Sequence, residues 1–136
     1  DTLKSLSLYC NIHTFDINQE RVNLPSTSNI KFHKLDNHNI DQFVNENKVL
    51  FENIESPILM IEDSHENTNG IIRAINPFLK SGDYLVIEDT LSQRKYKNTI
   101  LSENGIRNMN YEVDTFYCDF WGVNNSWNVN SIFKKM

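Results

Sequence analysis

The sequence lacks the features of a membrane protein and of a nucleic-acid-binding protein. No apolar run approaches the ~20 residues that a helix needs to cross a bilayer, and no signal-peptide pattern opens the chain. Lysine and arginine number 13 against 18 aspartates and glutamates, which gives a net charge of −5. Without a basic stripe to neutralise phosphates, non-specific nucleic-acid binding is disfavoured. We therefore expect neither a membrane nor a nucleic acid as partner.

Cysteine is also scarce. Cys10 and Cys118 lie far apart in the sequence and form no metal-type or redox-type pair. We interpret them as reduced thiols of a cytoplasmic protein. The length of 136 residues, with 39% hydrophobic and 11% aromatic residues, predicts one folded domain over residues 1–136.

One stretch, residues 57–90, dominates the pattern. Its apolar runs 58–61 and 84–87 predict two strands buried on both faces. Between them, apolar residues at helical spacing predict a helix, with Asn67 or Thr68 as its cap and Ser81-Gly82 as its end. A strand–helix–strand of this length forms a right-handed parallel crossover, so both strands end at the same edge of one sheet.

The amino-terminal part predicts further α/β elements. Residues 1–9 show loose helical spacing, as at the end of a helix, and residues 11–17 and 30–35 predict strands. A helix is expected from the cap Asn39 to about Glu55, with Gln42 completing a capping box.

The carboxy-terminal part predicts a helix and a hairpin. A polar loop over 91–98 precedes a short helix that ends near Arg107. Alternating residues then predict strands over 111–121 and 127–134, joined by the turn GVNNS.

Four of the predicted strands end in acids, namely Asp16, Asp36, Glu62-Asp63 and Glu88-Asp89. Acids are common after strands, so ordinary caps and loop residues are one interpretation. The other is a ligand that attracts carboxylates at one sheet edge: a cation, a metal ion or ribose hydroxyls.

The residues DSH at 63–65 and PFLKSGDYLVIEDT at 77–90 resemble the cephalosporin hydroxylase family, which includes rhamnosyl O-methyltransferases. The resemblance extends to residues 15–16, 32–36 and 111–122. It implies a class I S-adenosylmethionine-dependent methyltransferase fold. This is a Rossmann-like α/β sheet, mostly parallel, with a carboxy-terminal antiparallel β-hairpin. Some members of the family bind Mg²⁺.

The resemblance also implies a site. Asp63, Glu88 and Asp89 become ligands of Mg²⁺, which prefers oxygen donors. Asp16 would accept hydrogen bonds from the cofactor's ribose. Asp36, or the backbone beside it, would lie against the adenine, although turn chemistry explains Asp36 equally simply.

Two further residues near the proposed ligands have open roles. Glu62 is interpreted as a hydrogen-bond acceptor behind the ligands or a salt-bridge partner, outside the ligand set. His65 is the candidate general base, because imidazole titrates near neutrality, with a substrate contact or a plain loop residue as alternatives.

The implied reaction is Mg²⁺-assisted methyl transfer to a hydroxyl of a sugar or another small polyhydroxylated molecule. A non-catalytic remnant or binding module, and a hydroxylase as in the family name, are the alternatives. The sequence is compatible with a homo-oligomer but does not determine the oligomeric state.

Glycine is scarce, with four residues in the whole chain. Class I methyltransferases begin with a strand and a glycine-rich turn around the methionine end of the cofactor, and no glycine precedes Gly70 here. We therefore expect the chain to be the carboxy-terminal part of a longer protein, which by itself binds the cofactor poorly.

Overall fold

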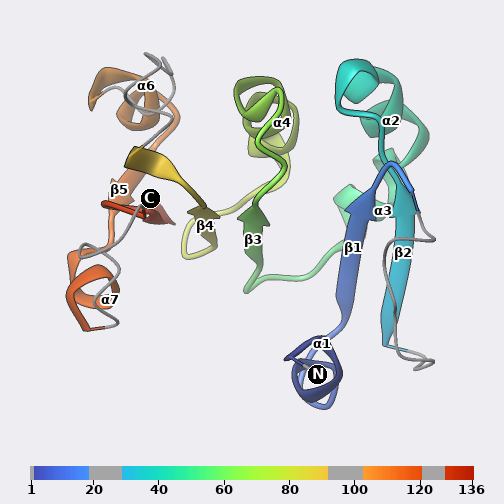
Figure 1. The fold of residues 1–136 in the computed structure, drawn as a ribbon, viewed down its shortest axis with the longest axis horizontal. Helices are drawn as coiled ribbons and strands as arrows, with labels where there is room; N and C mark the ends of the chain where they lie inside the picture. Colours follow the sequence, from blue (N-terminus) through green and yellow to red (C-terminus); the bar gives the residue numbers. More distant parts are fainter. Residues whose placement is uncertain (1, 19–28, 92–102, 121–127) are drawn as a thin grey trace. The chain divides into compact units, whose positions relative to one another are not determined.

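The computed structural model describes residues 2–18, 29–91, 103–120 and 128–136 (Figure 1). The chain divides into two compact units, Asp1–Phe43 and Val44–Met136, which we describe separately. Both units combine helices with strands, as the α/β prediction requires. The prediction of a single domain over residues 1–136 stays a prediction.

The first unit is built on two parallel strands. Helix α1 (Thr2–Leu6) precedes β1 (Ile12–Asp16), which pairs with β2 (Ile30–Lys34) so that Asp16 stands opposite Lys34. The ring of Phe15 stacks on His33 and meets Phe43 edge-on, with centroids 5.0 and 5.5 Å apart. Both predicted strands are confirmed, and their carboxyl ends lie at one edge.

The helix predicted from Asn39 to Glu55 is broken into three pieces, so the prediction of one continuous helix was wrong. They are the 3-10 turn η2 (Asn37–Asn39), α2 (Ile40–Glu46) and α3 (Lys48–Asn53). The cap is Asp36, whose Oδ1 accepts the backbone N–H of His38 at 3.0 Å. The break falls at Asn47, which has non-helical dihedrals. Asparagine favours caps and turns over helix interiors because its side chain competes for backbone hydrogen bonds.

The second unit contains a mixed four-stranded sheet. It consists of β3 (Leu59–Glu62), β4 (Tyr84–Ile87), β5 (Tyr111–Val113) and β6 (Ile132–Lys135), in the order β3-β4-β6-β5. Strands β3 and β4 are parallel, and β6 is antiparallel to both of its neighbours. Strands β3, β4 and β5 therefore run in the same direction and present their carboxyl ends at one edge.

The predicted crossover helix joins β3 to β4. It comprises α4 (Thr68–Ile75) and the 3-10 turn η3 (Asn76–Phe78). Its buried isoleucines are Ile71, Ile72 and Ile75. Asn67 occupies the cap position, without a side-chain cap bond, and Gly82 adopts φ +92°, which suits the predicted turn.

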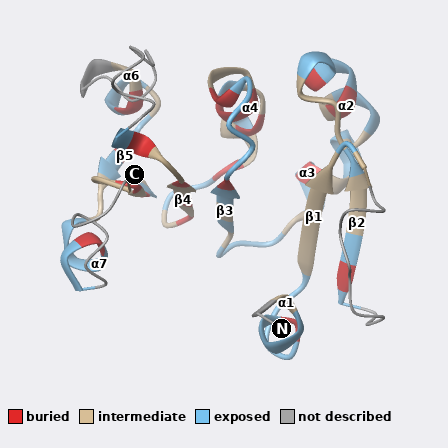
Figure 2. Cartoon of the chain, in the orientation of Figure 1, coloured by how far each residue is buried: buried red, intermediate tan, exposed pale blue. Residues whose placement is uncertain are grey.

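The prediction that both crossover strands are buried on both faces is wrong for β3. Leu59 and Ile61 are 61% and 57% exposed (Figure 2). Within the described residues, β4 is the one pairing partner of β3, which makes β3 an edge strand of this sheet. Strand β4 is central, and its Leu85 and Ile87 are fully buried.

The carboxy-terminal part differs from the predicted pair of long strands. Helix α6 (Glu103–Asn108) and the antiparallel pairing of β5 with β6 confirm the predicted order. The strand predicted over 111–121 was wrong, because it stops at Val113 and α7 (Thr115–Phe120) follows. The carboxylate of Asp114 accepts the N–H of Tyr117 at 3.2 Å, and this local bond starts the helix. The predicted loop at 92–98 and the turn at 122–126 lie outside the described residues.

No helix within the described part of the chain is long and apolar enough to cross a membrane.

Candidate metal and cofactor site

A backbone hydrogen bond connects the carboxyl ends of β3 and β4. The N–H of Glu88 donates to the carbonyl oxygen of Glu62 at 3.0 Å, one step beyond the paired residues Glu62 and Ile87. The two acid pairs predicted from the sequence therefore lie side by side in the second unit.

The segment before β6 holds the residues that follow β4. The N–H of Asp89 donates to Oδ1 of Asn128 at 2.6 Å, and the hydroxyl of buried Thr90 donates to the carbonyl of Val129 at 2.6 Å. Sequence analysis had no signal for this anchoring, because the partners are 39 residues apart.

The three predicted metal ligands and the predicted base form one cluster. Nε2 of His65 lies 3.3 Å from Oδ1 of Asp63, and its Nδ1 lies 3.5 Å from Oδ2 of Asp89. Asp63 lies close enough to Glu88 to raise the pKa of that carboxyl, after the larger effect of burial. The structure thus brings Asp63, His65, Glu88 and Asp89 together, as the shared strand edge predicts.

The surroundings of Glu88 disfavour its charged form. Burial raises the pKa of Glu88, and the charge and hydrogen bond of Asp63 and the charge of Asp89 raise it further, while His65 opposes the shift. A carboxyl whose pKa is raised by neighbouring carboxylates indicates an excess of negative charge. A cation at this edge would relieve the repulsion.

Glu62 is a fourth carboxylate at this edge. It is 2% exposed, and its Oε1 accepts both the N–H of Ser64 at 3.0 Å and the Ser64 hydroxyl. Its Oε2 is buried and has no hydrogen-bond partner within the described residues. Sequence analysis placed Glu62 outside the ligand set. Its position as the last residue of the strand, paired with buried Ile87, is the feature that could have placed Glu62 in the predicted ligand set.

The backbone around the cluster is unusual. His65, Asn67 and Asp89 have φ values of 58°, 52° and 52°, in the left-handed region that residues other than glycine rarely adopt. Such conformations cluster at functional sites, where the surrounding contacts hold them in place.

The donor chemistry of this edge fits Mg²⁺, which binds carboxylate oxygens and retains water. Within the described residues, however, no group of three His, Cys, Asp or Glu side chains is arranged so that it could hold a metal ion. The predicted ligands Asp63, Glu88 and Asp89 are therefore close together, but their side chains do not form a ligand set.

The predicted cofactor residues belong to the first unit. Asp16 ends β1, and its Oδ1 accepts the N–H of Asn18 at 2.9 Å. Both carboxylate oxygens of Asp36 cap η2, through the N–H of His38 and the side-chain amide of Asn39, and these bonds lower the pKa of Asp36. Asp36 thus has the turn role that the sequence left open. For Asp16, the cofactor role stays a prediction.

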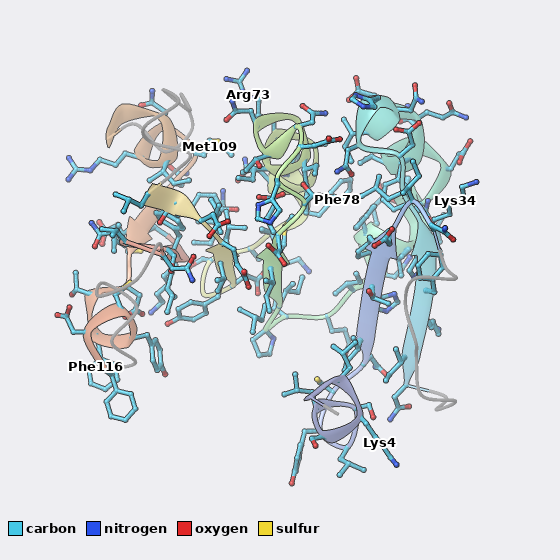
Figure 3. All side chains as sticks on the ribbon, in the orientation of Figure 1. Lys4, Lys34, Arg73, Phe78, Met109 and Phe116 are labelled. Carbon is cyan, nitrogen blue, oxygen red and sulfur yellow. The ribbon has the colours of Figure 1, made fainter. Side chains whose placement is uncertain are left out.

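Exposed aromatic residues gather on α7. The rings of Phe116 and Phe120 stack with centroids 5.8 Å apart, and Phe116 projects away from its helix (Figure 3). The shallow hollow on this helix is lined by Thr115, Phe116, Asp119 and Phe120, and contains none of the predicted site residues.

Comparison with known proteins identifies the fold. No protein-family model and no curated protein matches the chain. Among solved structures, an apo structure of CmcI matches with a TM-score of 0.72 and 22% identity, over 98% of this chain and 55% of that one. A structure of CmcI with Mg and SAM matches with a TM-score of 0.68 and 23% identity, over 98% and 56%.

The chain has the fold of CmcI. The resemblance to the cephalosporin hydroxylase group is thereby confirmed at the level of the fold, with α/β architecture and mixed sheets. The chain spans slightly more than half the length of the CmcI structures that it matches.

Proposed function

We propose that the protein containing this chain is an S-adenosylmethionine-dependent, Mg²⁺-assisted O-methyltransferase. Its acceptor is a hydroxyl of a sugar or of another small polyhydroxylated molecule. Neither a nucleic acid nor a membrane takes part. The two free cysteines, Cys10 and Cys118, support a cytoplasmic location.

One observation carries the proposal. Asp63, Glu88 and Asp89 converge at the carboxyl edge of a sheet whose fold matches a CmcI structure with Mg and SAM. Open α/β sheets bind ligands at this edge. Vicinal hydroxyls and carboxylates are both oxygen donors, so a polyhydroxylated acceptor suits a hard cation held there.

Each residue has a role in this proposal. Asp63, Glu88 and Asp89 hold the metal, with buried Glu62 as a fourth carboxylate whose Oε2 needs a partner. His65 takes the proton of the acceptor hydroxyl at a ring nitrogen. Asp16 accepts hydrogen bonds from the cofactor's ribose, and the backbone beside Asp36 lies against the adenine. When bound, S-adenosylmethionine supplies the methyl group, and Mg²⁺ supplies positive charge beside the acceptor oxygen.

The deciding experiment is a calorimetric titration of the chain with Mg²⁺. We expect a binding signal that Asp63→Asn and Glu88→Gln each abolish, because each removes a charged oxygen donor. Glu112→Gln, which changes an exposed glutamate of β5, is the matched control and should bind as the parent does. Equal binding by all four proteins would refute the metal site.

A non-catalytic role is the alternative that one observation favours. In the described residues no three potential ligands are arranged to hold a metal ion, as expected if the acids only cap strands and loops. The same titration separates the two proposals, because a binding module without a metal site gives no signal in any of the proteins. No observation favours the hydroxylase alternative.

A further inference from the structure

Two histidines contact each other across the sheet of the first unit. His13 of β1 is paired with Lys31 of β2, two residues before His33, so both histidines lie on the same face of the strands. Nδ1 of His13 lies 2.9 Å from Nε2 of His33, which is a hydrogen-bond distance. The ring planes are inclined by 23°, with centroids 5.1 Å apart. The pair is therefore a diagonal cross-strand contact between two titratable rings.

The surroundings of the pair disfavour additional positive charge. Both histidines are half-buried, and the ring of His33 also stacks on Phe15, which Phe43 of α2 meets edge-on. Burial, followed by the charges of His33 and Lys31, lowers the pKa of His13. The cross-strand neighbour of His13 is thus a cation, and the adjoining rings are apolar.

Other charged residues of the strands and helices around the pair point elsewhere. Because side chains alternate along a strand, Asp16 and its partner Lys34 lie on the opposite face of the sheet. The charged residues of α1 and α2 are exposed, namely Lys4, Asp41 and Glu46. Among the described residues, the charged group that acts on His13 besides His33 is Lys31.

The contact can accept only a limited number of protons. A hydrogen bond between two imidazoles needs one nitrogen that carries a hydrogen and one that offers a lone pair. One added proton preserves this arrangement, whereas two added protons leave two N–H groups facing each other. In the unfolded chain both rings take up a proton below their ordinary pKa of about 6.5. The unfolded chain then binds one proton more than the intact pair, so stability falls with falling pH.

We propose that the pair formed by His13 and His33 is a pH-sensitive contact between β1 and β2, which persists with at most one added proton and is broken by a second. This inference is independent of the proposed function, because neither histidine belongs to the proposed metal or cofactor residues. The stability that the contact contributes is complete above about pH 6.5 and is lost as the pH falls below that value.

The test is urea denaturation of the chain at pH 7.5 and pH 5.5. His13→Gln and His33→Gln each keep a polar side chain in the pair but remove one titratable ring. On acidification we expect the unfolding equilibrium constant of the parent to rise about 10-fold more than that of either variant, because one proton distinguishes the two states. His38→Gln, at an exposed histidine outside the pair, is the matched control and should keep the pH dependence of the parent.

A second readout needs no substitution in the pair. In a proton NMR titration of the folded parent, the ring signals of His13 and His33 should together report the uptake of one proton between pH 8 and pH 5.5. Uptake of two protons by the folded pair over this range would overturn the proposal. The same pH dependence of unfolding in the parent and in both glutamine variants would also overturn it.

Discussion

The N–H of Asp89 donates to the side-chain oxygen of Asn128 across 39 residues of sequence, at 2.6 Å. Asp89 has φ 52°, a conformation that needs support from its surroundings. The segment before β6 thus holds a proposed metal ligand at the end of β4. A residue that orients a ligand in this way typically contributes 10–100-fold to metal affinity.

We therefore predict that Asn128→Ala weakens Mg²⁺ binding by about 10-fold. The substitution leaves all carboxylates in place and removes the acceptor for the Asp89 N–H. Calorimetry measures the affinity, and Asn108→Ala, at an exposed residue of α6, serves as the matched control. An unchanged affinity would show that Asp89 keeps its position without Asn128, or that it is not a ligand.

Glu62→Gln separates two roles of the buried glutamate. Glutamine retains an oxygen that accepts the N–H and hydroxyl of Ser64, so the turn carrying His65 should persist. It loses the charged oxygen, and we predict Mg²⁺ affinity at least about 10-fold lower if Glu62 is the fourth carboxylate. If the titration matches the parent, Glu62 acts only through Ser64. Circular dichroism should confirm that the variant is folded.

Asp83 anchors the other end of β4, away from the metal edge. It is fully buried, and its two oxygens accept the N–H groups of Ile58 at 2.9 Å and Lys80 at 2.7 Å. We predict that Asp83→Ala lowers the free energy of unfolding by about 3 kcal/mol, because two buried donors lose charged acceptors. Urea denaturation measures the loss.

Asp83→Asn retains one acceptor oxygen and should cost less than Asp83→Ala. Asp41→Asn, at an exposed position of α2, should be nearly neutral. Equal stability of Asp83→Ala and the parent would show that the two N–H groups find other acceptors.

The buried hydroxyl of Tyr111 should make the stability of the fold depend on alkaline pH. Its hydroxyl is buried without a partner in the described residues, and burial, followed by the charge of Asp83, raises its pKa to about 12. Since this value exceeds the ordinary pKa of about 10, its contribution to stability is complete below pH 10 and is lost as pH rises through about 12.

Tyr111→Phe should remove this part of the alkaline destabilisation. At neutral pH it should leave stability unchanged or raise it by about 1 kcal/mol, since an unsatisfied buried hydroxyl disappears. The comparison requires unfolding free energies of both proteins from pH 8 to 12. Parallel pH curves would contradict the prediction.

The convergence of the acids could be predicted from the sequence, and the reason is geometric. Parallel crossover strands end at the same edge, so an acid after each strand implies acids that meet, and Asp63, Glu88 and Asp89 do meet. The role of Asp36 could not be decided from the sequence, because the same residue pattern occurs in turns and in ligand-binding loops. The structure shows both of its oxygens in the turn.

Secondary structure was harder to predict where a polar side chain acts against the hydrophobic periodicity of the segment. The run from Tyr111 to Phe120 alternates like a strand, yet Asp114 caps a helix within it. Asn47 likewise interrupts a helix that apolar spacing alone would continue. At Asp114 a side chain that accepts a backbone hydrogen bond outweighs the alternating pattern of its neighbours. The side chain of Asn47 makes no cap hydrogen bond, and the break there matches the low helix propensity of asparagine.

The sequence by itself determined the strand–helix–strand crossover, whose two strands end in acids at a common edge of the sheet. These features follow from the spacing of apolar residues and from the right-handedness of such crossovers within one continuous stretch. Only the tertiary structure decided what surrounds that edge. The Asn128 side chain accepts the N–H of Asp89, and His65 lies between two carboxylates. Oε2 of Glu62 has no hydrogen-bond partner in the part of the chain that the structure describes. These relationships depend on contacts between distant segments and on side-chain directions, which residue patterns along one strand or helix do not contain.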